Sequence, residues 1–248
     1  MSGARIFRCL LFVLFLLTAA PVPVLARAAN GALDLHSLSH PPGSVPWNIL
    51  VLLTVLTLLP AIVLSMTPFV RLLVVFHFLR QALGTQSTPT NQTLIGLSLI
   101  LTFFLMQPVG AAIHDAAIVP YEEGQTDAMG ALDRSAAPIR KFMLKYSREK
   151  DLALFLDLAK EPRPERPEDL PMRVVLPAYL ISELKAGFQI GAALYLPFLV
   201  VDMAVAAVTT AVGMFQLPPV VISTPLKILL FVMVDGWNLL VGSLMKSF

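Results

Sequence analysis

Long uncharged apolar segments interrupted by proline constrain this chain more than any other feature. Residues 41–70 and 81–113 contain no Lys, Arg, Asp or Glu, and residues 186–245 contain only three charged side chains. A helix that crosses the hydrocarbon core of a bilayer needs about 20 consecutive apolar residues. These segments therefore predict four membrane spans, over residues 47–70, 94–113, 175–212 and 220–245.

The composition excludes an ordinary soluble domain. Of the 248 residues, 56% are hydrophobic and 14% are charged, whereas a typical soluble domain carries about 25% charged residues. Lipid or a partner protein must cover the excess apolar surface. The formal net charge of +2, with no basic run interleaved with aromatics, gives no support for nucleic-acid binding.

The first 28 residues have the three parts of a secretory signal peptide. Arg5 and Arg8 form a basic start, residues 10–17 form an apolar core, and small residues favour cleavage after Ala26 or Ala28. A retained first helix is the alternative. Cleavage would leave residues 29–46 as an exported leader with a periplasmic N-terminus. The single cysteine would be removed with the signal, so disulfides are not expected, and the four histidines lack metal-ligand spacing.

Residues 114–173 carry most of the charge and predict a small helical portion on the periplasmic side. They hold ten basic and twelve acidic residues. Ser135 and Pro138 favour a helix start, after which apolar residues fall on one face of each of two helices. Four prolines then form a stiff linker. The two apolar sets are Ile139, Phe142, Met143 and Tyr146, followed by Leu152, Phe155, Leu156 and Ala159.

Eight prolines interrupt the apolar segments, and each one inside a helix removes a backbone hydrogen bond. In lipid, the freed carbonyl must be satisfied by protein or water. We therefore expect an all-α membrane protein of about four kinked helices in two hairpins, 47–113 and 174–248, packed against protein. The general frequency of proline in membrane helices is the weaker alternative. The prolines are Pro60, Pro68, Pro108, Pro177, Pro197, Pro218, Pro219 and Pro225.

A few polar and small residues in the apolar runs are candidates for function or packing. Asp202, Lys227 and Asp235 are ionisable groups at membrane depth. A helical hairpin would bring Asp202 and Lys227 together, and a structural ion pair is favoured over a proton relay. Gly187 and Gly191 are spaced for close helix packing, within the chain or between copies. No hydrolase, zinc or phosphate-loop motif is present, so neither an enzyme nor a bound cofactor is expected.

Several long motifs resemble one family in the same order along the chain. They are RQALGTQSTPTNQTLIGLSLILTFFLMQPV at 80–109, PAYLISELKAGFQIG at 177–191, PFLVVDM at 197–203 and GMFQLPPVVISTPLKILLFVMVDGWNLLVGSL at 213–244. These segments resemble the flagellar biosynthetic protein FliP, over about residues 47–248 apart from part of the charged middle. Thr90 departs from the family, which often has a second proline there.

The resemblance implies a place in a flagellar type III secretion export gate in the inner membrane, within the flagellar basal body. Five FliP-like subunits would assemble with FliQ and FliR around a pore for unfolded flagellar proteins, near FlhA, FlhB and the basal-body ring. The family closes its pore with a methionine-rich loop, which corresponds here to Met214, Phe215, Gln216, Leu217, Pro218 and Pro219. Only Met214 of the methionine run is kept. Methionine is flexible and packs around varied shapes.

Three other functions remain open from the sequence alone. A virulence injectisome subunit would share the core motifs, although the exported leader favours the flagellar branch. A small-solute transporter would also have broken helices and buried charges, but the four spans show no internal repeat. A scaffold that never lines the pore is the third alternative.

Overall fold

The computed structural model describes residues 47–162, 164–214 and 216–248. The predicted signal peptide, its cleavage positions Ala26 and Ala28, the leader and Phe215 lie outside the described residues. Every regular element in the described ranges is helical, which confirms the all-α class. The chain divides into two units within its first described helix, between Thr57 and Leu58, so all the later helices belong to the second unit.

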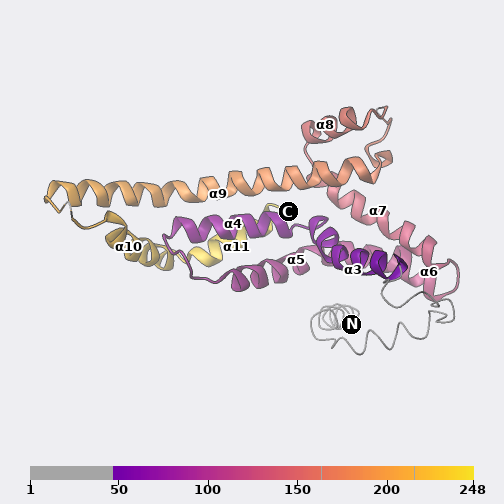
Figure 1. Cartoon of the computed structure of the whole chain (residues 1–248), viewed down its shortest axis with the longest axis horizontal. Helices are drawn as coiled ribbons and strands as arrows, with labels where there is room; N and C mark the ends of the chain where they lie inside the picture. The colour runs from indigo at the N-terminus through magenta and orange to yellow at the C-terminus, as the bar shows by residue number, and fades with distance from the viewer. Residues whose placement is uncertain (1–46, 163, 215) are drawn as a thin grey trace. The chain divides into compact units, whose positions relative to one another are not determined.

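Nine α-helices are described, and their labels follow Figure 1. The long helices α5 and α9 are each long and apolar enough to cross a membrane. Two further spans result if each bent pair, α3 with α4 and α10 with α11, is counted as one. The helices are α3 (Trp47–Ser65), α4 (Phe69–Ala82), α5 (Asn91–Ile113), α6 (Val119–Glu122), α7 (Ala128–Tyr146), α8 (Glu149–Ala159), α9 (Met172–Ala211), α10 (Pro219–Met233) and α11 (Gly236–Lys246), with a π-helical turn at His114–Ile118 and a 3₁₀ turn at Pro167–Asp169.

The predicted span over residues 47–70 is broken at Pro68, where the chain turns by 73° between α3 and α4. Pro68 has no N–H and cannot continue the helical hydrogen bonds. The freed Leu64 carbonyl instead accepts from the Thr67 hydroxyl at 2.7 Å. The Thr-Pro pair thus makes a bend whose polar groups are satisfied locally, as membrane depth requires.

The other prolines divide into two groups. Pro218 caps α10 and Pro219 is its first residue, so this predicted break is present. Pro60, Pro108, Pro177, Pro197 and Pro225 lie inside helices that continue past them, and α9 runs unbroken for 40 residues. The expected breaks are therefore present at Pro68 and Pro218, whereas each proline inside a helix removes one hydrogen bond without ending the helix.

A second bend of 66° separates α10 from α11 and was not predicted. Asp235 lies there with φ 51° and ψ 50° and is followed by Gly236. Aspartate tolerates the left-handed region better than most residues. A Cβ on Gly236 would collide with the Phe231 ring. The Asp-Gly pair therefore ends α10 in the middle of what the sequence indicated as one span.

The helix predicted to start near Ser135 and Pro138 begins earlier, at Ala128. The Asp127 carboxylate accepts from the Gly130 N–H at 2.9 Å and caps it, which is a stronger start signal than proline alone. The predicted apolar faces are present except for Ala159, which is exposed. They pack with the first turns of α9 in a cluster whose buried members are Met143, Leu156, Leu170, Val174, Val175 and Tyr179.

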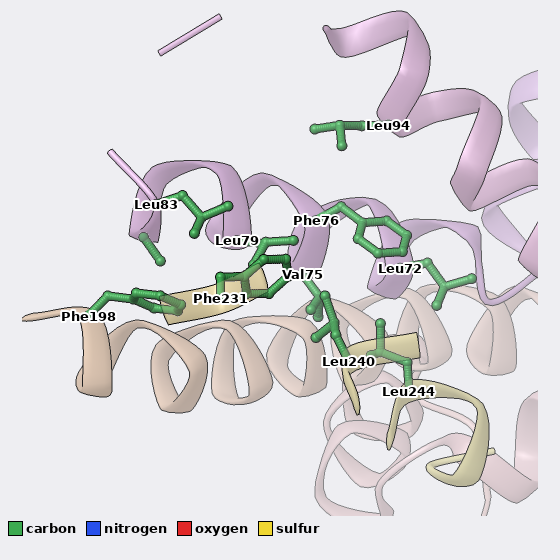
Figure 2. Packing of buried hydrophobic residues seen from close by; sticks show 11 residues of the cluster. Leu72, Val75, Phe76, Leu79, Leu83, Leu94, Phe198, Phe231, Leu240 and Leu244 are labelled. Atoms are coloured by element: carbon green, nitrogen blue, oxygen red, sulfur yellow. The ribbon is translucent and has the colours of Figure 1, made fainter. Parts of the chain in front are cut away.

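The larger core surrounds α4, whose buried residues recur every three or four positions. Figure 2 shows these α4 side chains gathered with Leu94 of α5 and with residues from α9, α10 and α11. At 14 residues, α4 is about 21 Å long, too short to cross a bilayer alone, and protein encloses much of it. The cluster comprises Leu72, Val75, Phe76, Leu79, Ala82, Leu83, Leu94, Phe198, Phe231, Leu240 and Leu244.

Large apolar side chains remain exposed on the outward faces of the long helices. Met203 on α9 is 66% exposed and Met233 on α10 is 78% exposed, as are comparable residues on α5. Only 17% of each candidate span in α5 and α9 is buried within the chain. A single chain thus leaves many large apolar side chains of these helices without full protein cover.

Candidate functional site

The candidate pore loop connects α9 to α10 over residues 212–218. Gly213 has φ +78°, and two hydrogen bonds close the end of α9: Gly213 N–H to Thr210 O and Met214 N–H to Thr209 O, both 3.0 Å. This pattern is the Schellman motif, which needs a residue in the left-handed region. Gly213 therefore fixes the direction in which the chain leaves α9.

The described residues of this loop are exposed or partly exposed. Met214 is 40% and Leu217 is 47% exposed, and Gln216 and Pro218 are exposed while Pro219 is partly covered. Apolar side chains at this connection between helices are thus left largely uncovered by the chain itself. The loop lies at the far end of α9 from α7 and α8 (Figure 1).

Asp202 and Lys227 come together across the α9–α10 hairpin. Lys227 Nζ donates to Asp202 Oδ2 at 2.5 Å, with the lysine side chain 4% and the aspartate side chain 29% exposed. The ammonium is therefore desolvated and depends on this partner. The pair holds the hairpin closed behind the loop. Asp235, the third charged candidate, is exposed at the α10–α11 bend, so it is not a buried charge within this chain.

Gly187 and Gly191 form the seam where α9 receives α4. A Cβ on Gly187 would lie 3.2 Å from Val74, and one on Gly191 would lie 2.5 Å from the Phe78 ring. The two helices run in the same direction, side by side (Figure 1). The glycine spacing thus serves close packing within the chain, which was one of the two expected uses.

A buried ion pair lies at one end of this seam, and the sequence patterns did not predict it. Arg71 of α4 donates to Glu183 of α9, whose side chain is 0% exposed. The Arg71 guanidinium also lies 3.9 Å from the centroid of the Phe248 ring and contacts Ser247. The Tyr146 ring on α7 lies 5.8 Å from the same guanidinium. Helices α4, α7 and α9 and the C-terminal residues therefore meet at the Arg71 side chain.

Both residues can be located in the sequence, but no pattern there pairs them. Arg71 is the first charge after a long uncharged run, and Glu183 lies in the motif that precedes Gly187. Arg71 lies inside α4 and is buried there. Arg80 does hold the α4–α5 connection, where it donates to Asn91 at 2.6 Å.

Ser182 and Glu183, adjacent in sequence, face different partners. The Ser182 hydroxyl donates to Asp151 at 2.7 Å and accepts from the Arg148 N–H at 3.0 Å, which ties α8 to α9. Glu183 faces Arg71 on α4. They do not form a nucleophile and base. Among the described residues, no group of three or more His, Cys, Asp or Glu side chains is placed to hold a metal.

Comparison with known proteins identifies the family. A sequence model described as the FliP family matches residues 52–244. The chain belongs to the FliP family. It is 51% identical over 212 residues to the flagellar biosynthetic protein FliP of Pectobacterium carotovorum, covering 84% of this chain and 82% of the relative. It is 47% identical over 220 residues to that of Bacillus subtilis, covering 88% and 100%.

A more distant relative extends the match. The FliP of Agrobacterium fabrum is 41% identical over 241 residues, which covers 94% of this chain and 98% of the relative. These FliP proteins are named for flagellar biosynthesis and not for a catalysed reaction. The resemblance inferred from the four motifs is thus confirmed, and the chain is a membrane protein of this family and not an enzyme.

Proposed function

We propose that this chain is a pore-lining subunit of the flagellar type III protein export gate in the bacterial inner membrane. Its relatives are flagellar biosynthetic proteins that it matches over most of its length. The observation that supports a pore role is the α9–α10 loop. It carries exposed Met214 and Leu217 beside Gly213 and Pro218, which fix its two ends.

Several copies would arrange these loops as a ring. Apolar side chains from neighbouring loops then close on one another and exclude water and ions. Methionine has three rotatable bonds and repacks easily, so the ring yields to an unfolded chain and closes behind it. Gln216 makes this ring less apolar than the methionine run of the family, and Leu217 adds apolar surface.

The exposed helix faces support an assembly of several subunits. We propose a homo-oligomer, of five copies by family resemblance, together with FliQ and FliR and in contact with FlhA, FlhB and the basal-body ring. Sister subunits cover the outward faces of α9 and α10, and unfolded rod, hook and filament proteins pass through the centre. The mature N-terminus and residues 114–173 lie on the periplasmic side.

Site-directed cross-linking tests the pore role directly. Cysteines are placed singly at 214, 216 and 217 in a Cys9→Ser background, and an export substrate fused to a tightly folded domain is stalled in the gate. We expect cross-links between these positions and the substrate. A cysteine at Leu158, which is 67% exposed on α8, serves as an exposed control outside the loop.

The outcomes separate the alternatives. Cross-links at the control and none at the loop would contradict a pore-lining role and leave a scaffold. A small-solute transporter would bind or move a solute without companion proteins. A virulence injectisome subunit would restore secretion by the injectisome to a strain that lacks the corresponding injectisome protein. It would not restore motility to a strain that lacks the flagellar gate protein.

A further inference from the structure

Charge is segregated along the segment that contains α7. From Asp115 to Asp133 there are five acidic and no basic residues, and from Arg134 to Arg148 there are five basic and no acidic residues. Residues 115–148 carry equal numbers of acidic and basic residues, but these are separated into an acidic end and a basic end. The acidic end comprises Glu122, Glu123 and Asp127. The basic end comprises Lys141 and Lys145, together with Arg166 from the loop that packs on α7.

The basic end is a shallow hollow and not only a run of lysines. Lys141 and Lys145 on α7 line it together with Arg166, Leu144, Pro167 and Glu168, so it holds three cations and one anion. Arg140 donates to the Glu168 carbonyl at 3.2 Å and holds this loop against α7. Within the described ranges, Lys141 and Arg166 have no carboxylate partner.

The acidic end lies on exposed backbone around the α6–α7 turn. Glu122, Glu123 and Asp127 are all exposed. Large apolar side chains close to them in the sequence are exposed as well: Met129 is 67% exposed, Leu132 63% and Tyr121 52%. An apolar centre with charges at its rim is the usual composition of a protein interface.

The two ends cannot neutralise each other within one chain. Asp127 and Lys141 are 14 residues apart on one helix, which is about 21 Å. At physiological ionic strength the screening length is about 8 Å. The helix dipole accounts for Asp127 at the N-cap of α7 and for Lys145 in its last turn. It does not account for Glu122 and Glu123 before the helix, or for Arg166 on another segment.

We propose that the acidic end of one copy docks in the basic hollow of the next copy. This inference rests on the proposed homo-oligomer and assigns one of its contacts. Two different complementary patches on one chain make a head-to-tail contact, which repeats around a ring until the ring closes. Acid facing base also disfavours the reversed pairing of like ends.

Charge reversal in the full chain, expressed with its membrane partners, tests the contact. Lys141→Glu with Arg166→Glu reverses the basic end, and Glu122→Lys with Glu123→Lys reverses the acidic end. These changes avoid Asp127, which caps α7, and Lys145, which contacts Phe248. Each reversed variant is expected to yield about tenfold less oligomer on native gels, because like charges then face each other. The four-residue combination should return to within about twofold of wild type.

Cross-linking gives a second measurement that does not depend on stability. Chains with Glu122→Cys and chains with Lys141→Cys, both in a Cys9→Ser background, are co-expressed and oxidised. We expect a disulfide-linked dimer of the two kinds of chain. Asp157→Lys on α8, an exposed reversal outside both ends, is the matched control and should leave oligomer yield unchanged.

The results distinguish this contact from the proposed function. If wild type oligomerises and neither reversal nor the cysteine pair has any effect, the contact is overturned while the export-gate role stands. If wild type forms no oligomer, the export-gate role itself fails. If the four-residue variant stays as defective as the basic-end variant, and only basic-end reversal abolishes binding to vesicles of anionic phospholipid, the hollow binds lipid and the contact is overturned.

Discussion

At the scale of single residues, this chain depends on two ion pairs that join α9 to its neighbours. Arg71–Glu183 links α9 to α4, and Asp202–Lys227 links α9 to α10. In lipid, apolar helix faces gain little from meeting each other, since the acyl chains are equally apolar. Polar contacts and close packing therefore decide which helices associate.

Breaking the Arg71–Glu183 pair should destabilise the chain strongly. Glu183→Leu alone leaves a buried guanidinium without its carboxylate, and we expect a loss of about 3–5 kcal/mol. Replacing both residues, with Arg71→Met and Glu183→Leu, should recover most of that loss, because no uncompensated charge remains. Thermal unfolding in detergent measures both variants.

The exposed pair Arg173–Glu161 is the matched control. Its side chains are 70% and 26% exposed, so Arg173→Leu should change stability by at most about 1 kcal/mol. Equal losses from the exposed and buried pairs would mean that Arg71–Glu183 has no special role.

Exchanging the charges of Asp202 and Lys227 tests the second pair. Each single change, Asp202→Lys or Lys227→Asp, places like charges together on the hairpin and should abolish motility. The double exchange restores attraction and should recover swimming in soft agar to at least about half of wild type. A double exchange that is as defective as either single change would indicate that the two residues act separately.

The pairing of Asp202 with Lys227 could be expected from sequence, whereas the pairing of Arg71 with Glu183 could not. The first two residues flank a proline break at similar distances, so a hairpin aligns them. Arg71 and Glu183 are 112 positions apart and belong to different hairpins. Only the packing of α4 on α9 brings them together, and no local pattern encodes that packing.

At the scale of helices, the sequence predicted apolar faces well and helix ends less well. The break at Pro218 and the apolar faces of α7 and α8 were expected. The bend at Asp235 and the start of α7 at Asp127 depended on single residues, a left-handed aspartate and a capping carboxylate. Such signals are short, and a long hydrophobic run hides them.

The α4–α9 seam predicts a clear difference between two glycines. Gly191→Ala would place a Cβ 2.5 Å from the Phe78 ring, well inside van der Waals contact, so the two helices must separate. We expect a loss of about 1–3 kcal/mol. Gly96→Ala on α5 meets nothing within 4 Å and should be neutral or gain up to about 1 kcal/mol from better helix propensity.

Thermal unfolding of the two variants in detergent measures this difference. If Gly191→Ala were as stable as Gly96→Ala, the close approach of α4 to α9 would be wrong.

Shortening the pore loop should open the closed gate. Deleting residues 214–216 removes Met214 and shortens the proposed seal to Leu217, while Pro218 can still cap α10. Cells expressing this variant should leak ions and small solutes across the inner membrane, measured as loss of membrane potential and growth inhibition by high salt. A deletion variant that assembles normally and stays tight would argue against the seal.

At the scale of the whole molecule, a single chain does not fully cover the apolar surface of its own membrane helices. Two of the described helices are long enough to span a bilayer, and two bent pairs bring the number to four, yet many of their large apolar side chains are exposed in the single chain. The composition indicated this excess. The sequence could not show which faces are covered by lipid and which by protein, because both covers are apolar.

The mass of the assembly purified from native membranes in mild detergent tests this central claim most directly. If sister subunits cover the exposed faces of α9 and α10, native mass spectrometry should find several copies of this chain together with two small membrane proteins. A stable, solitary chain with no companion proteins would contradict the account, even though its membership of the FliP family would stand.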